Sequence, residues 1–158
     1  MHERAADFAA RAAAEIDVGV DVHEFPEGTK TAADAAEAIG CDVAQIASSL
    51  AFVADDQLVV VVTSGANRVD ESRLAEIHDV DPSAVRMAEP DEVKTTLGWS
   101  IGGVPPFLHE TDVPVSLDET LTDFETVWAA AGTPAAVFPI APGRLQRLAE
   151  AEVERVAT

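Results

Sequence analysis

The sequence is poor in several residues that proteins use for crosslinks, membrane insertion and nucleic-acid contacts. Its single cysteine, Cys41, excludes an internal disulfide and is typical of a reducing compartment. The apolar run at residues 58–62 is far shorter than the roughly 20 residues of a membrane helix, and the N-terminus has no continuous apolar segment of the kind found in export signals. We therefore expect a cytoplasmic protein without a membrane partner.

Basic residues are also scarce, since ten Lys and Arg face 29 Asp and Glu and the net charge is −19. This balance argues against a broad basic surface, so we expect no DNA partner and at most a small RNA contact. The carboxylates are spread along the whole chain, which favours adaptation to a salt-filled cytoplasm, where charge repulsion is screened. Binding of basic partners is the alternative explanation.

The length of 158 residues predicts one domain over residues 1–158. Hydrophobic periodicity and capping signals predict helices over residues 3–16, 31–40, 70–77, 90–98 and 142–149, with a further helix starting at Asp42. Strands are predicted over residues 18–25, 51–53, 57–63, 85–88, 113–117, 126–130 and 135–140. The irregular alternation predicts a mixed α/β (α+β) fold in which helices flank a mixed, barrel-like sheet.

Two glycines and two prolines stand close together in the segment Ile101-Gly-Gly-Val-Pro-Pro-Phe-Leu-His-Glu110. Glycine lets a ligand approach the main chain, whereas proline fixes its own φ and restricts its predecessor. The segment therefore predicts a rigid cradle for a ligand. A tight connecting turn is the other interpretation.

Several familiar chemistries have no support in the sequence. Cys41 has no basic neighbour and fits a buried hydrophobe better than an activated thiolate. The four histidines lack metal-ligand spacing, so we expect no metal and no cofactor. Ser48 and Ser49 lack the strand-turn-helix context of a serine hydrolase. Trp99 and Trp128 are expected in the core, although Trp99 has a second possible place at the mouth of the cradle.

A series of short motifs resembles the YbaK and prolyl-tRNA synthetase-associated editing domains, which hydrolyse wrongly charged aminoacyl-tRNA. The resemblance covers about residues 22–151, and its motifs occur in family order. They are Thr31-Ala-Ala-Asp-Ala-Ala-Glu-Ala-Ile-Gly40, Ala44-Gln-Ile-Ala-Ser-Ser-Leu-Ala-Phe52, Ser64-Gly-Ala-Asn-Arg-Val-Asp70, Trp99-Ser-Ile-Gly-Gly-Val-Pro-Pro-Phe107, Ser116-Leu-Asp118 and Ala130-Ala-Gly-Thr-Pro134.

The resemblance implies a metal-free, freestanding deacylase that acts in trans on tRNA carrying a small amino acid such as alanine, cysteine or serine. Its partners would be the aminoacyl-tRNA 3′ end and, as a candidate, an aminoacyl-tRNA synthetase. The family's GxxxP loop corresponds to Gly102 and Pro106, and family chemistry uses the terminal ribose hydroxyl to orient water. Expected catalytic residues are Gly102 and Gly103, through their backbone amides, and His109, through substrate binding or proton transfer. A solvated loop histidine without a role is the other interpretation of His109. Expected substrate-binding residues are Thr31, Ser48, Ser49, Pro105, Pro106 and Asp118.

Two positions depart from the family pattern. Ser48 stands where the family has a lysine, and Leu108 replaces the glycine that follows Pro-Pro-Phe. A serine cannot replace the ammonium group of lysine. Three outcomes stay open: substitution of the lysine by Lys30, Arg68 or salt cations, a weaker deacylase, or a non-catalytic binder of tRNA ends or aminoacyl nucleotides.

Overall fold

The structure is a computed structural model that describes residues 3–25 and 31–157. The described helices are α1 (Glu3–Glu15), α2 (Ala32–Ile39), α3 (Glu71–His78), α4 (Pro90–Leu97) and α5 (Pro142–Ala149). The described strands are β1 (His23–Glu24), β2 (Ile46–Ala54), β3 (Gln57–Ser64), β4 (Val85–Met87), β5 (Val115–Asp118), β6 (Val127–Ala130), β7 (Ala136–Ile140) and β8 (Glu152–Glu154). None of the described helices is long and apolar enough to cross a membrane.

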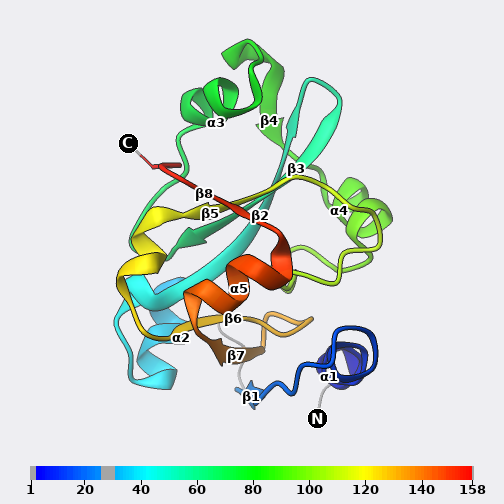
Figure 1. The fold of residues 1–158 in the computed structure, drawn as a ribbon, viewed down its shortest axis with the longest axis vertical. Helices are drawn as coiled ribbons and strands as arrows, with labels where there is room; N and C mark the ends of the chain where they lie inside the picture. The colour runs from blue at the N-terminus through cyan, green and yellow to red at the C-terminus, as the bar shows by residue number, and fades with distance from the viewer. Residues whose placement is uncertain (1–2, 26–30, 158) are drawn as a thin grey trace.

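One mixed sheet organises the molecule, with the strand order β1-β7-β6-β2-β3-β5-β8 and with β4 paired to β2 off this path. Strand β2 runs parallel to β6, and β5 runs parallel to β3 and β8, whereas the remaining pairs are antiparallel. Figure 1 shows the helices around this sheet, with α5 in front of it and α3 beside β4. The predicted mixed sheet with flanking helices is confirmed.

The hairpin of β2 and β3 is the centre of the sheet, and it turns at Asp55 and Asp56. Both turn residues have positive φ, 46° and 71°, as two-residue hairpin turns of the favoured type require. The valines that follow Leu58 are at most 1 % exposed, and alternate members contribute to two different core clusters. The predicted burial of β3 on both faces is therefore confirmed.

Helix α1 packs on the core through Ala5, Phe8 and Ala12. The Phe8 ring contacts three other aromatic rings, those of Trp99, Phe107 and Phe138. Trp99 is fully buried, as expected, and the guanidinium carbons of Arg4 and Arg11 lie 4.4 and 5.3 Å from its ring centroid. Large aromatic surfaces packed in this way anchor the helix to the sheet.

Three local predictions were wrong, and one strand was missed. The strand expected over residues 18–25 shrinks to β1, because only His23 and Glu24 pair with β7. The helix expected at Asp42 is a three-residue 3-10 turn, Val43–Gln45, and β2 begins immediately after it. Strand β8, which pairs with β5, was not predicted. Trp128 is only half-buried, instead of lying in the core.

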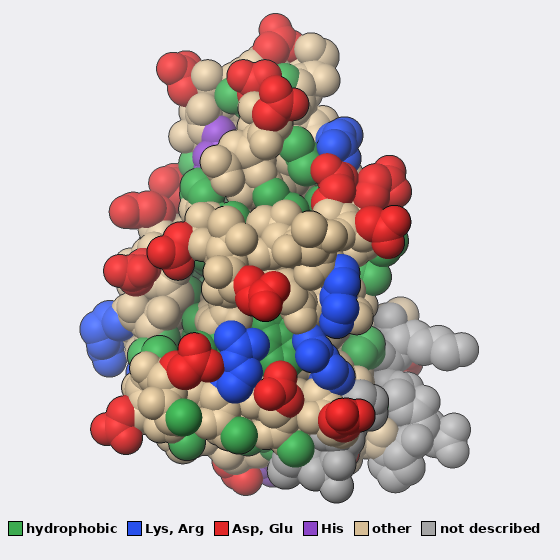
Figure 2. All heavy atoms as spheres, turned by 90° about the vertical axis from the view of Figure 1, so that its right-hand side faces the viewer, with side chains coloured by type: hydrophobic (Ala, Val, Ile, Leu, Met, Phe, Trp, Pro, Cys, Tyr) green, Lys and Arg blue, Asp and Glu red, His purple; other side chains and the backbone are tan. Residues whose placement is uncertain are grey.

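The acidic side chains do not gather in one patch on the face shown in Figure 2. Figure 2 shows Asp and Glu side chains scattered over the viewed face from top to bottom, with several basic side chains among them in the lower half. Among the described residues, ion pairs at short range include Arg11 with Glu15 and Arg86 with Glu92, which is few for a net charge of −19. Most of the negative charge is therefore left to solvent and its ions to screen.

Candidate active site

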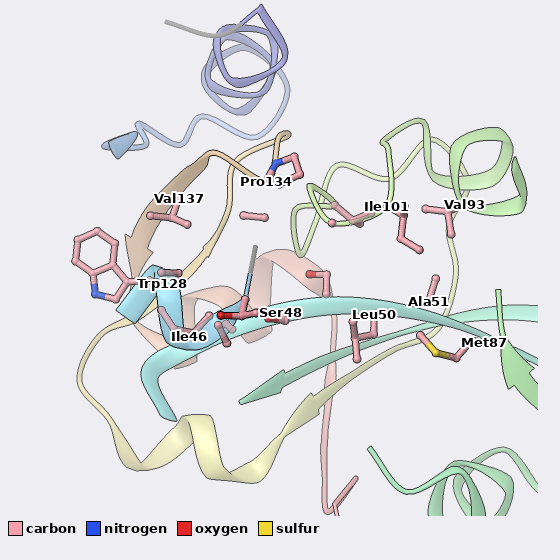
Figure 3. Close-up of a pocket in the computed structure, with 18 residues that line it drawn as sticks. Ile46, Ser48, Leu50, Ala51, Met87, Val93, Ile101, Trp128, Pro134 and Val137 are labelled. Atoms are coloured by element: carbon pink, nitrogen blue, oxygen red, sulfur yellow. The ribbon is translucent and has the colours of Figure 1, made fainter. Parts of the chain in front are cut away.

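A pocket lies between the start of α2, the first half of β2, β4, α4, the loop after α4 and the β6–β7 hairpin (Figure 3). Segments far apart in sequence thus meet around one cavity. The residues that line it are Thr31, Ala32, Ala35, Ile46, Ala47, Ser48, Ser49, Leu50, Ala51, Met87, Val93, Ile101, Gly102, Val104, Trp128, Ala130, Pro134 and Val137.

The described wall of the pocket carries no charged side chain, and its polar side chains are those of Thr31, Ser48 and Ser49. Figure 3 shows Trp128 and Val137 at one end and Met87 at the other, with Ser48 between them. Mostly apolar walls with a few convergent polar groups are usual for small-ligand sites. The arrangement suits a small ligand with a mainly apolar surface and a few groups that form hydrogen bonds.

Thr31 and the two serines reach the pocket for different local reasons. The Thr31 Oγ1 accepts a hydrogen bond from the Asp34 N–H at 3.1 Å, so Thr31 caps α2 at the rim of the pocket. Ser48 and Ser49 are neighbours on β2 and their side chains point to opposite faces of the sheet. The Ser49 Oγ is buried and has no hydrogen-bond partner among the described residues.

The two glycines of the loop have different surroundings. Gly102 lines the pocket and has φ +87°, a conformation that side-chain-bearing residues rarely adopt. Gly103 is buried against the turn after β6: a Cβ placed on it would lie 2.6 Å from the Thr133 Cα. The Gly103 N–H donates to the Ser100 carbonyl at 3.0 Å. Gly102 is thus the glycine of this pair that faces the cavity.

Pro105, Pro106 and His109 follow the two glycines in the same loop and do not line the pocket. Both prolines are buried, and the His109 Nε2 lies 2.8 Å from the Pro105 carbonyl oxygen, to which its N–H donates. Burial lowers the pKa of His109, opposed by the hydrogen bond to Pro105 and by the charge of Asp112. The neutral imidazole therefore joins two residues of the same loop, His109 and Pro105, through this hydrogen bond.

Leu108 has a backbone conformation that favours glycine. Its φ of +63° lies in the left-handed region, which costs a residue with a Cβ roughly 1 kcal/mol or more. Its carbonyl accepts a hydrogen bond from the Trp99 indole N–H at 2.9 Å. Trp99 itself is not part of the pocket lining.

Asp118 is 1 % exposed and lies outside the pocket lining. One carboxylate oxygen accepts hydrogen bonds from the Thr63 hydroxyl, the Ser64 N–H and the Asn67 side-chain amide, and the other accepts from the Thr120 N–H. Burial raises the pKa of Asp118, but these hydrogen bonds together outweigh it and lower the pKa. The carboxylate ties β3 to the end of β5.

Of the nine residues predicted for the site, the structure brings Thr31, Ser48, Ser49 and Gly102 together around the pocket. It places Gly103, Pro105, Pro106, His109 and Asp118 outside the lining. Sequence reasoning missed Met87, Val93, Trp128, Pro134 and Val137. Met87 and Ile101 are 50 % and 51 % exposed, and they are two of the three exposed large hydrophobic residues in the described part of the chain. Their exposure in the structure is the signal that identifies the rim of the pocket.

No group of three or more His, Cys, Asp or Glu side chains among the described residues is arranged to hold a metal ion. Cys41 is partly exposed, and burial together with the charge of Asp42 raises its pKa. A raised pKa leaves the thiol less reactive at neutral pH.

Comparison with known proteins decides the family. Residues 26–148 match the family model of the aminoacyl-tRNA editing domain. The chain belongs to this family. YwhH of Bacillus subtilis (strain 168), which is uncharacterized, is 34 % identical over 134 residues that cover 84 % of this chain and 83 % of YwhH. The proline–tRNA ligase of Shouchella clausii (strain KSM-K16) is 30 % identical over 116 residues, 73 % of this chain and 20 % of the ligase.

A solved structure supports the same family at the level of fold. It is described as a candidate trans-editing enzyme for prolyl tRNA synthetase, and it matches with a TM-score of 0.92 at 35 % identity. The match covers 100 % of this chain and 99 % of that one. The resemblance inferred from the sequence motifs is confirmed, and the family acts on aminoacyl-tRNA.

Proposed function

We propose that this editing-domain protein is a freestanding, cytoplasmic hydrolase that deacylates mischarged tRNA carrying a small amino acid such as alanine, cysteine or serine. The observation that carries the proposal is the uncharged pocket between β2 and Gly102, in a chain that matches a candidate trans-editing enzyme over nearly the whole of both chains. A prolyl-tRNA synthetase is the candidate protein partner, because part of a proline–tRNA ligase is similar to this chain.

The reaction would use water as the nucleophile and need no metal. The water oxygen forms a bond to the ester carbonyl carbon, the tetrahedral oxyanion collapses, and the bond to the ribose oxygen breaks, which releases the amino acid and tRNA with a free hydroxyl. Backbone N–H groups stabilise such an oxyanion. Gly102 is the donor we propose from the loop, since its main chain borders the cavity. The neighbouring ribose hydroxyl of the substrate would orient the water, as the family resemblance implies.

We assign the remaining predicted residues by their position. Thr31, Ser48 and Ser49 would contact the substrate, because all three residues line the cavity. Gly103, Pro105, Pro106 and His109 would hold the loop in shape behind Gly102, and His109 would act as a positioning residue through its bond to Pro105. Asp118 would fix the sheet below the site through its four hydrogen bonds.

A non-catalytic binder of tRNA ends or aminoacyl nucleotides is the second candidate. The observation that favours it is Ser48, which lines the pocket at the position of the family lysine. No basic side chain belongs to the described lining. Binding by such a protein would rely on the apolar walls and the main chain, and the ester would survive.

A deacylation assay in concentrated potassium chloride separates the two functions. Purified protein is mixed with alanyl-, cysteinyl-, seryl- and prolyl-tRNA, and Ser48→Lys and Gly102→Val are assayed beside it. Turnover by the native chain that Gly102→Val abolishes supports the hydrolase and names the amino acid. Binding of the tRNAs without turnover, with activity only in Ser48→Lys, supports the binder. Unchanged turnover by a folded Gly102→Val would remove the loop from the mechanism.

A further inference from the structure

Strand β2 has a gap along one of its edges, and the gap lies at the pocket. Along this edge β6 pairs with Ile46 and Ala47, and β4 pairs with β2 only from Phe52 onward. The Ala88 N–H reaches back to the Ala51 carbonyl at 3.0 Å. Among the described residues no strand pairs with this edge at residues 48–51, all four of which line the pocket.

The hydrogen-bond alternation of the β2–β3 ladder fixes which peptide groups face the gap. The Gly65 N–H donates to the Ile46 carbonyl at 2.8 Å, so Ile46 and Gly65 form a hydrogen-bonded pair. Because such pairs alternate along an antiparallel ladder, the next pair, Ala47 and Ser64, is not hydrogen-bonded. Ser48 and Leu50 therefore exchange hydrogen bonds with β3. The N–H and C=O of Ser49 point the other way, toward the open edge.

The polar groups of Ser49 have little else to bind. Its Oγ is buried without a partner among the described residues, and no carboxylate belongs to the described lining of the pocket. A buried polar group without a hydrogen bond is destabilising, so a ligand that satisfies it gains affinity. The α-ammonium of a bound amino acid thus has main-chain and hydroxyl oxygens as its acceptors here.

We propose that the aminoacyl group binds along this open edge of β2: the Ser49 N–H donates to the ester carbonyl, and the Ser49 carbonyl and Oγ accept from the α-ammonium. This inference rests on the proposed function and deepens it. The main chain of Ser49 would recognise the α-amino acid ester shared by all substrates, whereas the apolar walls would select the side chain. The Ser49 N–H would be a second donor to the oxyanion, in addition to the donor proposed at Gly102.

A ligand titration followed by ¹H–¹⁵N NMR in concentrated potassium chloride tests the contact. The probe is alanyl-3′-amino-3′-deoxyadenosine, in which an amide replaces the labile ester. We expect the Ser49 amide to shift strongly while those of Ser48 and Leu50, already bonded to β3, shift little. A response from Met87 and Ile101 with an unmoved Ser49 amide would overturn the proposal.

A matched probe tests the ammonium contact. In the lactyl analogue a hydroxyl group replaces the α-ammonium with little change in size. Loss of a charge-assisted hydrogen bond predicts about tenfold weaker binding or more. Equal affinity of the two probes would show that the ammonium is not recognised.

Substitution at Ser49 completes the test. Ser49→Pro removes the N–H that faces the gap and spares the ladder to β3, whereas Ser49→Ala removes only the hydroxyl group. We expect Ser49→Pro to lower kcat/KM by at least about tenfold relative to Ser49→Ala, at equal thermal stability. Equal kcat/KM of the two variants would contradict the proposal. If Ser49→Pro does not fold, the NMR titration alone tests the Ser49 contact. If the probe binds at Ser49 but the ester is not hydrolysed, only the proposed hydrolase function is contradicted. If the ester is hydrolysed but the Ser49 amide resonance does not shift with the probe, only the proposed Ser49 contact is contradicted.

Discussion

The backbone of Gly103 packs directly on the backbone of Thr133, with so little space between them that a Cβ on Gly103 would stand 2.6 Å from the Thr133 Cα and 2.8 Å from its nitrogen. This contact joins the loop after α4 to the turn between β6 and β7. Both segments border the pocket, through Gly102 and Pro134 respectively. The shape of the cavity therefore depends on a position that does not itself face it.

Gly103→Ala should destabilise the fold, because the added methyl group must displace backbone atoms of Thr133. We expect a loss of about 1–3 kcal/mol in the free energy of unfolding, measured by urea titration in potassium chloride. Gly19→Ala is the matched control, since a Cβ there meets nothing within 4 Å, and its effect should stay within about 0.5 kcal/mol. Equal stability of the two variants would show that the loop moves aside freely.

Asp118→Asn should act on stability and leave substrate affinity unchanged. The amide offers only one acceptor oxygen to the four donors around Asp118 and turns its NH₂ toward some of them. We expect a loss of about 1–3 kcal/mol at pH 7. Asp123→Asn, at an exposed position, is the control. A raised KM with native-like stability would instead place Asp118 in the substrate site.

His109 should make the protein less stable as the pH falls. Its pKa is lower in the folded state than the ordinary value of 6.5, mainly because of burial. The unfolded chain therefore binds the proton first, and stability decreases as the pH drops from above 6.5 through the folded-state pKa. His109→Gln should flatten the thermal stability between pH 7.5 and 5.5 relative to the native chain. The pKa of His78 is lowered as well, but His78 is present in both proteins and cancels in the comparison. An unchanged pH profile would contradict this assignment.

Potassium chloride should stabilise the fold, since the net charge is −19 and the described ion pairs are few and exposed. The Debye length falls from about 10 Å at 0.1 M to about 3 Å at 1 M, so most of the gain should occur below about 1 M. Thermal unfolding at increasing salt measures it. Sucrose at matched osmolality controls for effects other than screening, and equal stabilisation by sucrose would argue against charge repulsion.

The elements that were predicted correctly carry strong local signals. Thr31 caps α2 and Gly40 ends it with φ +86°, while Pro90 opens α4 and Gly98 closes it with φ +82°. Such caps act within one turn of chain, so the sequence reports them directly.

The errors arise where distant pairing overrides a local signal. The capping box of Asp42 and Gln45 exists in the structure, yet the helix that it predicts stops after three residues. Instead, residues 47–54 pair with β3 and Ile46 pairs with β6, a stabilisation that no local motif reports. The pocket shows the same limit, because Met87, Trp128 and Pro134 meet only once the sheet has formed.

The core contacts of α1 extend the folded unit beyond the residues that match the family model. Phe8 lies before the residues 26–148 that the family shares, yet its ring centroid is within 6.0 Å of Trp99, Phe107 and Phe138, which all lie inside that range. A protein trimmed to the shared residues would expose these three aromatic side chains to water. The unit that folds is therefore larger than the unit that the family has in common.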